Sequence, residues 1–334
     1  MTTTENSILI YGEVRQGIIH RVTQELAGKG RELGDRKGGL PVEVLLLTDF
    51  LEDAPEKLFR AGADRIYLVE HPSCSQFNQE IAAKVTAALV EERKPEILLA
   101  PATTSGRTVL PAVAALLGTG LTADCTDLSI EEETGLLLQT RPAIGGNVMA
   151  TIKTPEHRPQ MATVRPRTFP LPPEEDRSGE IIRPALPREC FESRVIPEGV
   201  QMLEGEAGNI EDMEVLVSGG KGLRGSEGFE LLQELAELLE GGVGASRQAV
   251  EAQWIGYPHQ VGLSGKVVSP KLYLAAGISG AVQHLAGMQT AGYIVGINKD
   301  PEAPLFRVAD LALCGDLYSI LPRLLERIRK ERGQ

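Results

Sequence analysis

The sequence predicts an α/β protein made of two parallel-sheet domains, and three observations support this fold class. Short apolar runs alternate with helical patterns in both halves of the chain, which is typical of a parallel sheet. A chain of 334 residues is too long for one ordinary core and suits about two domains. Residues 166–200 are rich in proline and charge and predict a partly extended interdomain connection. We therefore expect one domain over residues 1–200 and another over residues 201–334.

The first half contains the strand and helix patterns of a Rossmann-like domain. A helix is predicted over residues 77–93, because its apolar residues recur on one face. Residues 103–118 predict a capped helix that Pro111 would kink unless it lies in the first turn. Residues 135–154 and 158–166 are consistent with added strands. Four apolar runs before them predict strands over residues 7–13, 42–49, 63–70 and 95–102.

The second half restarts the same alternation. A strand over residues 213–220 ends in a glycine turn. An amphipathic helix follows over residues 226–242, with glycines at its end. Its apolar face carries Phe229, Leu232, Leu235 and Leu239. Four more apolar strands are predicted over residues 243–246, 272–279, 293–300 and 311–316.

The composition excludes several classes of function. The formal net charge of −12 and an aromatic content of 4% argue against nucleic-acid binding, which needs a basic face or stacking side chains. No apolar run reaches the roughly 18 residues that a membrane span needs. The first residues show no basic segment followed by an apolar one, so we expect no signal peptide and a cytoplasmic location.

The cysteines give no sign of a metal centre. Cys74, Cys125, Cys190 and Cys314 are far apart and form no C-x-x-C pair. Zinc and iron–sulfur ligation are therefore not expected. We expect reduced and mostly buried thiols.

The strand ends of the second half predict a ligand site. In open parallel sheets, ligands bind beyond the carboxyl ends of the strands. Glycine and serine let a ligand approach the backbone, and polar side chains there would suit a nucleotide. Residues 218–228 match neither the P-loop nor the dinucleotide glycine pattern. The strand ends present Ser218-Gly219-Gly220-Lys221, Ser246-Arg247, Ile278-Ser279-Gly280, Asn298-Lys299-Asp300 and Gly315-Asp316.

Three side chains near this sheet edge suit a ring that gains negative charge, as a flavin does. Arg247 follows a buried strand, where an arginine must reach solvent, pair with an acid or meet a ligand. Ser264 lies in a glycine-flanked loop and adds a hydroxyl, and His284 adds an imidazole. Charge-assisted donors beside such a ring raise its reduction potential. The alternatives are a solvated Arg247 and a structural His284.

Four segments of the second half resemble the alpha subunit of electron transfer flavoproteins. The first half fits the same family more loosely, through residues 98–128 and 141–152. The resemblance implies a heterodimer with a beta subunit, which the N-terminal domain would contact. It also implies that the C-terminal domain is doubly wound and binds FAD. This FAD would carry electrons from donors such as acyl-CoA dehydrogenases to an acceptor. The four segments are residues 215–229, 243–250, 260–288 and 297–318.

The resemblance assigns cofactor contacts by motif. Ser246 and Arg247 would lie beside the isoalloxazine ring, and Ser264 would reach N5. His284 would reach O2, at the end of a segment beginning at Ser279 that holds the ribityl and diphosphate. The adenosine end would meet Asn298, Asp316 and Leu317. The full set is Lys221, Arg224, Ser246, Arg247, Gln260, Val261, Gly262, Leu263, Ser264, Gly277, Ser279, Gly280, Ala281, Val282, Gln283, His284, Asn298, Lys299, Asp300, Asp316 and Leu317.

Two residues depart from the family pattern. Many relatives have arginine where Lys221 stands, so a bidentate phosphate contact becomes a point charge, for which Arg224 would compensate. Ser264 is often threonine in mitochondrial-type relatives, but the hydroxyl is kept.

Three questions stay open from the sequence. Residues 151–166 look more like alpha subunits of anaerobic bacteria, including those that bifurcate electrons from NADH to ferredoxin with a second FAD in the beta subunit. A simple carrier and a bifurcating complex are both compatible with this chain, because the deciding flavin lies in the other subunit. A self-contained NAD-dependent oxidoreductase and a non-redox nucleotide-binding subunit are the rival interpretations. In the second of these, Arg247 would merely pair with a carboxylate.

Overall fold

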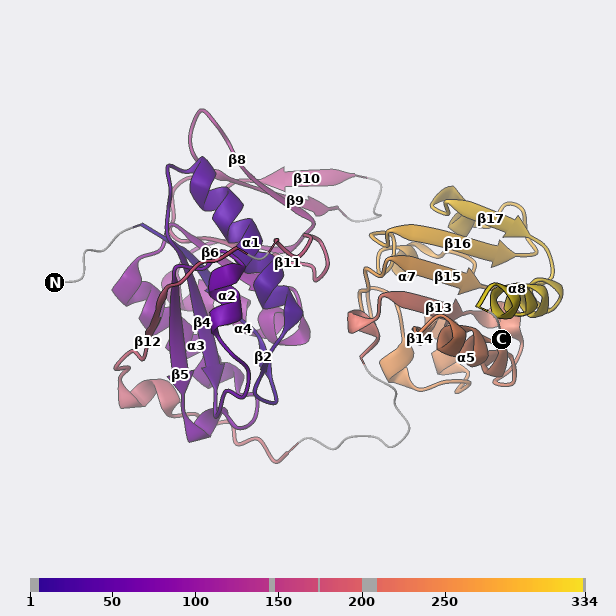
Figure 1. Ribbon diagram of the computed structural model, residues 1–334, viewed down its shortest axis with the longest axis horizontal. Coiled ribbons are helices and arrows are strands. Elements are labelled where there is room, and N and C mark those ends of the chain that lie inside the picture. Colours follow the sequence, from indigo (N-terminus) through magenta and orange to yellow (C-terminus); the bar gives the residue numbers. More distant parts are fainter. Residues whose placement is uncertain (1–5, 144–147, 174, 200–208, 333–334) are drawn as a thin grey trace. The chain divides into compact units, whose positions relative to one another are not determined.

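The computed structural model describes residues 6–143, 148–173, 175–199 and 209–332. The chain divides into two compact units, with the described residues up to 199 in the first and those from 209 onward in the second (Figure 1). Each unit is an α/β fold with its own parallel sheet. The predicted fold class is therefore confirmed.

The sheet of the first unit has seven strands in the order β12-β5-β4-β1-β6-β11-β7, all parallel to their neighbours. A three-stranded antiparallel sheet and a short two-stranded ribbon accompany it. The seven strands are β1 Ile8–Tyr11, β4 Val42–Thr48, β5 Arg65–Glu70, β6 Ile97–Pro101, β7 Leu121–Cys125, β11 Gln160–Val164 and β12 Glu180–Ile182. The remaining strands are β2 Val14–Arg15, β3 Ile18–Ile19, β8 Asp127–Ile130, β9 Leu137–Pro142 and β10 Met149–Ile152.

Helices cover both faces of this sheet, which explains why its strands are continuous apolar runs. Ile8 and Ile10 of β1 pack in a core with residues of α1 and α2, whereas Leu9 and Tyr11 pack on the other face with residues of α3 and α4. This alternation follows from the two-residue period of a strand. The helices are α1 Arg21–Arg36, α2 Glu56–Arg60, α3 Gln79–Arg93 and α4 Thr104–Leu117, with 3-10 turns η1 Pro72–Cys74 and η2 Arg188–Phe191.

Two predictions about the first unit need refinement. Pro111 lies well inside α4, beyond the first turn, and the helix runs from the Thr103 cap to Leu117 as one element. Residues 166–200 do more than connect two domains, because β12 adds to the sheet beside β5. Cys190 of η2 then packs into the core on the α3 side of the sheet. This segment is therefore an integral part of the first unit.

The second unit is a doubly wound five-stranded parallel sheet in the order β14-β13-β15-β16-β17. Numbered along this unit, the order is 2-1-3-4-5. The direction of winding reverses between β13 and β15, and such a reversal opens a crevice at the carboxyl edge. The strands are β13 Val215–Gly219, β14 Gly242–Ala245, β15 Leu272–Ala276, β16 Tyr293–Asn298 and β17 Leu311–Cys314.

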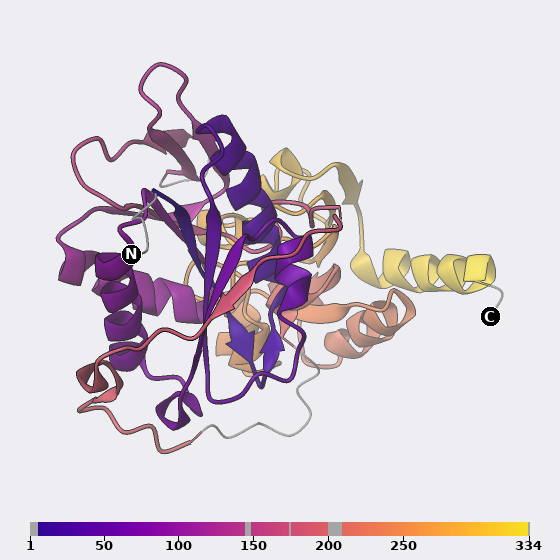
Figure 2. The ribbon, with the colours of Figure 1, turned by 60° about the vertical axis from the view of Figure 1, so that its left-hand side comes forward.

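Two long helices cover one face of this sheet and short segments cover the other. Phe229, Leu232 and Leu235 of α5 lie in the same core as Leu321 of α8, the C-terminal helix drawn in yellow in Figure 2. A separate core on the opposite face contains Tyr273 of β15. No helix in the described ranges is long and apolar enough to span a bilayer. The elements are η3 Ile210–Asp212, η4 Lys221–Leu223, α5 Gly228–Leu238, α6 Arg247–Glu251, η5 Tyr257–His259, α7 Val282–Leu285, η6 Pro304–Arg307 and α8 Leu317–Arg332.

Candidate functional site

A cavity of about 690 Å³ lies at the carboxyl edge of the second sheet. The segments that follow β13, β14 and β15 contribute to its wall, as does Asn298, the last residue of β16, so the cavity coincides with the crevice at the winding reversal. Its volume is in the range of sites for small molecules and cofactors. The strand-end rule therefore located this cavity correctly from the sequence.

The structure brings many of the predicted residues together around this cavity. Those that line it are Lys221, Ser246, Arg247, Val261, Gly262, Ser264, Gly277, Ser279, Ala281, Gln283, His284 and Asn298. The lining does not include Arg224, Gln260, Leu263, Gly280, Val282, Lys299, Asp300, Asp316 and Leu317. The predicted set lacked Gly222, Gln248, Glu251 and Ile278, which also line it. The spacing of Glu251, four residues after Arg247 on a helix, was a signal for that contact.

The Ser246 hydroxyl points to a missing ligand. Ser246 follows β14 and stands at the N-cap of α6. Its Oγ atom is buried, and it has no hydrogen-bond partner in the described part of the chain. A buried polar atom without a partner costs about 1–3 kcal/mol, so native proteins rarely keep one without a reason. A bound molecule with a hydrogen-bonding edge in this cavity would satisfy it.

Arg247 supplies one of the positive charges at the cavity, beside that of Lys221, and it has an acidic partner. Its Nε atom lies 2.7 Å from Oε1 of Glu251, one helical turn further on. The two side chains are 66% and 57% exposed. Exposed pairs with this spacing contribute only about 0.3–0.5 kcal/mol. The guanidinium is thus held weakly enough to turn toward a ligand.

Close contact between two glycine turns forms one wall of the cavity. A Cβ atom on Gly222 would lie 2.6 Å from the Gly277 Cα atom, and one on Gly220 would lie 2.4 Å from the Gly277 carbonyl oxygen. Gly277 also has a φ of +66°, which favours glycine. The turns after β13 and β15 therefore meet backbone to backbone, with the Gly222 amide donating to the Gly277 carbonyl oxygen at 2.9 Å, and the absence of side chains on these glycines lets a ligand lie close to this wall.

His284 lies at the cavity, but its ring is held by the protein itself. Nδ1 is 3.0 Å from the Val261 carbonyl oxygen, and Nε2 is 2.9 Å from the Tyr273 hydroxyl. A carbonyl oxygen only accepts, so Nδ1 carries the proton and Nε2 accepts from the hydroxyl of Tyr273. Burial lowers the pKa of His284 to about 4, and the hydrogen bond to Val261 opposes this only in part.

This arrangement corrects one expectation about the charge of the site. His284 was expected to join Arg247 in stabilising a negatively charged ring. With a pKa of about 4 the imidazole is neutral near pH 7, and both of its nitrogens are bonded within the protein. Desolvation is the physical reason, because a buried imidazole avoids the charged form.

Ser264 has a hydroxyl proton to offer. The Nε2 atom of Gln260 donates to Ser264 Oγ at 3.2 Å and to the Ser264 carbonyl oxygen at 3.1 Å. An amide nitrogen only donates, so Ser264 is the acceptor in this contact and keeps its own proton for another acceptor. Gln260 does not line the cavity, but it positions the residue that does.

The residues expected at the adenosine end already serve the fold. The Oδ2 atom of Asp316 lies 2.9 Å from Nζ of Lys299, and its Oδ1 accepts from the Tyr318 amide at 3.0 Å. Asp316 thus caps the start of α8, and the hydrogen bond from Lys299 lowers the pKa of its carboxyl. Asn298 donates from Nδ2 to the Ile278 carbonyl oxygen at 2.8 Å. Only Asn298 of these residues also faces the cavity.

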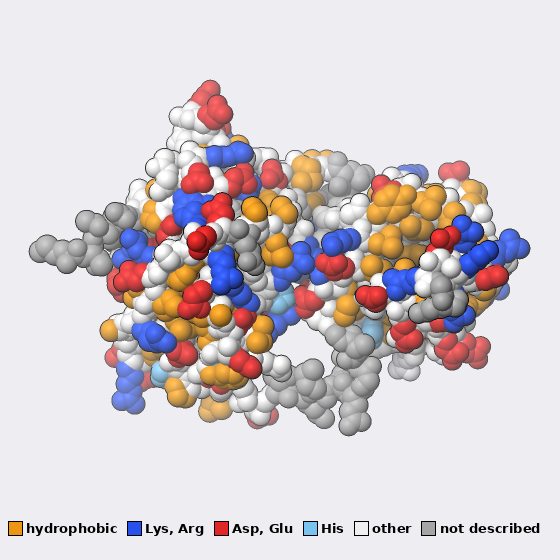
Figure 3. Space-filling view, viewed as in Figure 1, with side chains coloured by type: hydrophobic (Ala, Val, Ile, Leu, Met, Phe, Trp, Pro, Cys, Tyr) orange, Lys and Arg blue, Asp and Glu red, His pale blue; other side chains and the backbone are white. Residues whose placement is uncertain are grey.

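One face of the molecule carries side chains of both charges. Figure 3 shows lysine and arginine side chains interspersed with acidic ones on the face in view. Among the described residues, no group of three His, Cys, Asp or Glu is placed to hold a metal ion. The described cysteines are free thiols. The cavity of the second unit is therefore where the sequence and the geometry agree on a site.

The fold and this cavity define a class of protein: a two-unit α/β chain with a cofactor site at the winding reversal of its second sheet. Two family models identify that class further. The electron transfer flavoprotein domain matches residues 8–189, and the electron transfer flavoprotein FAD-binding domain matches residues 209–289. The chain belongs to the electron transfer flavoprotein family, as an alpha subunit, and its cofactor is FAD.

Curated relatives cover nearly the whole chain. The electron transfer flavoprotein subunit alpha of Thermoanaerobacterium thermosaccharolyticum is 46% identical, over 97% of this chain and 98% of that protein. That of Clostridium acetobutylicum is 44% identical, over 96% of each. The subunit LctC of the lactate dehydrogenase (NAD(+),ferredoxin) of Acetobacterium woodii is 40% identical, over 96% of this chain and 76% of that protein. The resemblance stated from the sequence is therefore confirmed.

Proposed function

We propose that this chain is the FAD-carrying alpha subunit of a heterodimer that moves single electrons between a flavin-containing dehydrogenase, of the acyl-CoA dehydrogenase type, and an acceptor. One observation carries the proposal. The segment that matches an FAD-binding domain holds a cavity with a buried, unpartnered hydroxyl, that of Ser246, at the winding reversal of its sheet. FAD would supply the one-electron chemistry, and the chain would hold it and set its potential.

The cavity residues fit the parts of FAD. Ser246 and Ser264 would donate hydrogen bonds to the ring edge, since neither hydroxyl proton goes to an acceptor among the described residues. The glycine turns around Gly222 and Gly277 would let the diphosphate approach the backbone. Lys221 lines the cavity beside them and would add a positive charge.

Arg247 would favour the negatively charged, reduced cofactor. At about 4 Å and an effective dielectric constant near 20, a unit charge contributes roughly 4 kcal/mol, and solvent around an exposed guanidinium lowers this. Glu251 offsets part of the charge through its ion pair with Arg247. Arg247 and Glu251 together would therefore influence the reduction potential of the bound FAD.

Flavin content and stepwise reduction test the proposal. The purified chain, reconstituted with FAD, should keep one flavin and accept electrons in two separate one-electron steps during photoreduction. A non-redox nucleotide-binding subunit would show no such separation, and a self-contained NAD-dependent oxidoreductase would bind NAD in this cavity instead of FAD. Either result would overturn the proposed role.

The partner chain decides between a simple carrier and a bifurcating complex. We propose that the first unit contacts a beta subunit, as in other members of the family. The relative from Acetobacterium woodii is named for NAD(+) and ferredoxin, which keeps bifurcation between NADH and ferredoxin as the alternative. Co-purification with the beta subunit, followed by a flavin count, separates the two: one FAD per heterodimer indicates a simple carrier, and two indicate bifurcation.

A further inference from the structure

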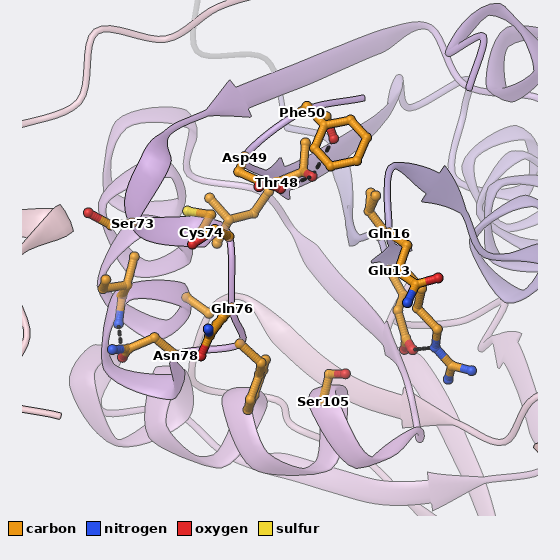
Figure 4. A pocket seen from close by; sticks show the side chains of 18 of the residues that line it. Glu13, Gln16, Thr48, Asp49, Phe50, Ser73, Cys74, Gln76, Asn78 and Ser105 are labelled. Atoms are coloured by element: carbon orange, nitrogen blue, oxygen red, sulfur yellow. Dashed lines mark hydrogen bonds and ion pairs between the residues drawn. The ribbon is translucent and has the colours of Figure 1, made fainter. Parts of the chain in front are cut away.

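The first unit has a cavity of its own, which the proposed electron transfer does not use. It also measures about 690 Å³, and it lies outside the carboxyl ends of β1 and β4 (Figure 4). The chain winds from β1 through β4 to β5 on one side of the sheet, and then returns to place β6 on the other side of β1. The cavity therefore occupies the winding reversal of the first sheet, where α/β folds bind ligands.

An acid stands where nucleotide-binding folds hold a ribose. Asp49 follows β4, the strand beside β1, and it lines the cavity. Its carboxylate accepts only a long hydrogen bond, 3.5 Å from the Thr48 hydroxyl, and it forms no ion pair with a described residue. In doubly wound folds an acid after the second strand accepts hydrogen bonds from ribose hydroxyls. Asp49 has the position and the acceptor capacity for this role.

A second observation points to a donor on the ligand. The Gln76 Oε1 atom is buried and has no hydrogen-bond partner among the described residues. Figure 4 shows Gln76 on the side of the cavity opposite Glu13 and Gln16. A carboxamide presents both an acceptor and donors, which matches the amine and ring nitrogen at the edge of a nucleic-acid base. A base in this cavity would supply the partner that Gln76 lacks.

The charges of the cavity disfavour phosphate. The lining carries two acids, Glu13 and Asp49, and one base, Arg15. Arg15 is already bonded to Glu13, with Nε 2.6 Å from Oε1. Thr103, the cap of α4, donates a hydrogen bond to the same carboxylate, so the positive end of α4 already has an anion beside it. An incoming phosphate would meet a net negative charge.

Two aromatic side chains offer a surface for a flat ring. Phe50 and Phe77 line the cavity, and they are 49% and 51% exposed. A planar base stacked on either ring would remove apolar surface from water. We propose that this cavity binds a nucleoside, meaning a ribose with an uncharged base and no polyphosphate, through Asp49 on the sugar and Gln76 on the base.

Calorimetric titration of the full chain tests this proposal, with adenosine as the probe. The protein is first saturated with FAD, so that the cavity of the second unit is filled and adenosine reports on the first unit. Adenosine should bind one site per chain, AMP should bind more weakly, and ATP more weakly still. No binding up to millimolar adenosine, or tighter binding of ATP than of adenosine, would overturn the proposal.

Variants separate this site from the FAD site. Asp49→Asn and Gln76→Ala should each weaken adenosine binding at least tenfold, while flavin content and absorbance stay unchanged. Glu52→Gln is the matched control, because it removes a neighbouring exposed carboxylate outside the cavity and should leave the affinity unchanged. Unchanged affinity in Asp49→Asn would refute the ribose role. Because FAD content is read on the same samples, a failure here is distinguishable from a failure of the electron-transfer proposal.

Discussion

His284 and Tyr273 form a buried hydrogen-bonded pair beside the candidate FAD cavity, with Nε2 of the histidine 2.9 Å from the tyrosine hydroxyl. Burial raises the pKa of Tyr273, so the phenol keeps its proton and acts as the donor. The pair joins α7 to β15, and the Val261 carbonyl oxygen holds the other side of the imidazole. Its first effect is therefore to fix the wall of the cavity.

Removing the Tyr273 hydroxyl should destabilise the second unit. Tyr273→Phe leaves the buried Nε2 of His284 without a donor, which costs about 1–3 kcal/mol of unfolding free energy. Urea unfolding monitored by circular dichroism measures the change. Tyr293→Phe is the control, because the Tyr293 side chain is 46% exposed. This variant should have the same unfolding free energy as the unmodified protein. Equal stability of the two variants would show that the pair contributes little.

His284 should also make stability depend on pH. The folded chain keeps this imidazole neutral down to a pKa of about 4, whereas the ordinary value is 6.5. Between these values the unfolded chain binds more protons, so the stability present above pH 6.5 is lost as the pH falls toward 4. The loss amounts to roughly 3 kcal/mol at most. The His284→Asn variant should lose less unfolding free energy than the unmodified protein as the pH falls from about 7 to about 5. If the unfolding free energies of the two proteins fell in parallel with pH, this prediction would be wrong.

Arg247 and Glu251 should shift the reduction potential of bound FAD in opposite directions. Arg247→Ala removes positive charge near the cofactor and should lower the first potential. Glu251→Gln frees Arg247 from its ion pair and should raise it. Each shift should be roughly 60 mV, which is a tenfold change for a one-electron couple. Potentiometric titration of the reconstituted protein measures both.

A similar ion pair elsewhere in the second unit provides the control. Arg327 and Glu331 are also four residues apart on a helix, with Nη2 and Oε1 2.7 Å apart and exposed side chains. Arg327→Ala should leave the potential where it is. If Arg247→Ala behaved in the same way, the arginine would have no role beside the ring.

Replacing Ser246 with alanine should not lower the stability of the FAD-free protein, but it should weaken FAD binding. In the FAD-free protein, Ser246→Ala removes a buried hydroxyl that lacks a partner, so stability should stay constant or rise by up to about 1 kcal/mol. In the FAD-bound protein the same change removes a hydrogen bond and should weaken binding by about tenfold. Thermal unfolding with and without FAD measures both effects. A loss of stability without FAD would mean that the hydroxyl has a partner within the protein.

The sequence predicted most of the strands and the sheet edge at which a cavity lies, because both depend on local patterns. Runs such as residues 42–49 are apolar throughout, because helices cover both faces of the sheet. The cavity was found because the turns after parallel strands meet at one edge. Glycine and serine residues at those turns indicated the position of the cavity from the sequence alone.

Other features depend on contacts between distant segments, which a single sequence does not reveal. Nothing in the pattern pairs Tyr273 with His284, and that pairing decides the protonation state of the imidazole. The edge strand Glu180–Ile182 is only three residues long and stands in a proline-rich segment, so it gave no strand signal. The cavity of the first unit needs the strand order β4-β1-β6, which only the folded chain reveals.

The contact between the two glycine turns gives the sharpest steric prediction. Gly222→Ala would place a Cβ atom 2.6 Å from the Gly277 Cα atom, and backbone on both sides cannot move apart cheaply. We expect a loss of about 1–3 kcal/mol in unfolding free energy, as for other overpacked sites, together with weaker FAD retention. Gly225→Ala is the matched control three residues away, since no heavy atom lies within 4 Å of its Cβ position. Chemical unfolding and flavin content after gel filtration compare the two variants. If Gly222→Ala kept both stability and FAD, the turn would not form the wall on which the diphosphate is expected to lie.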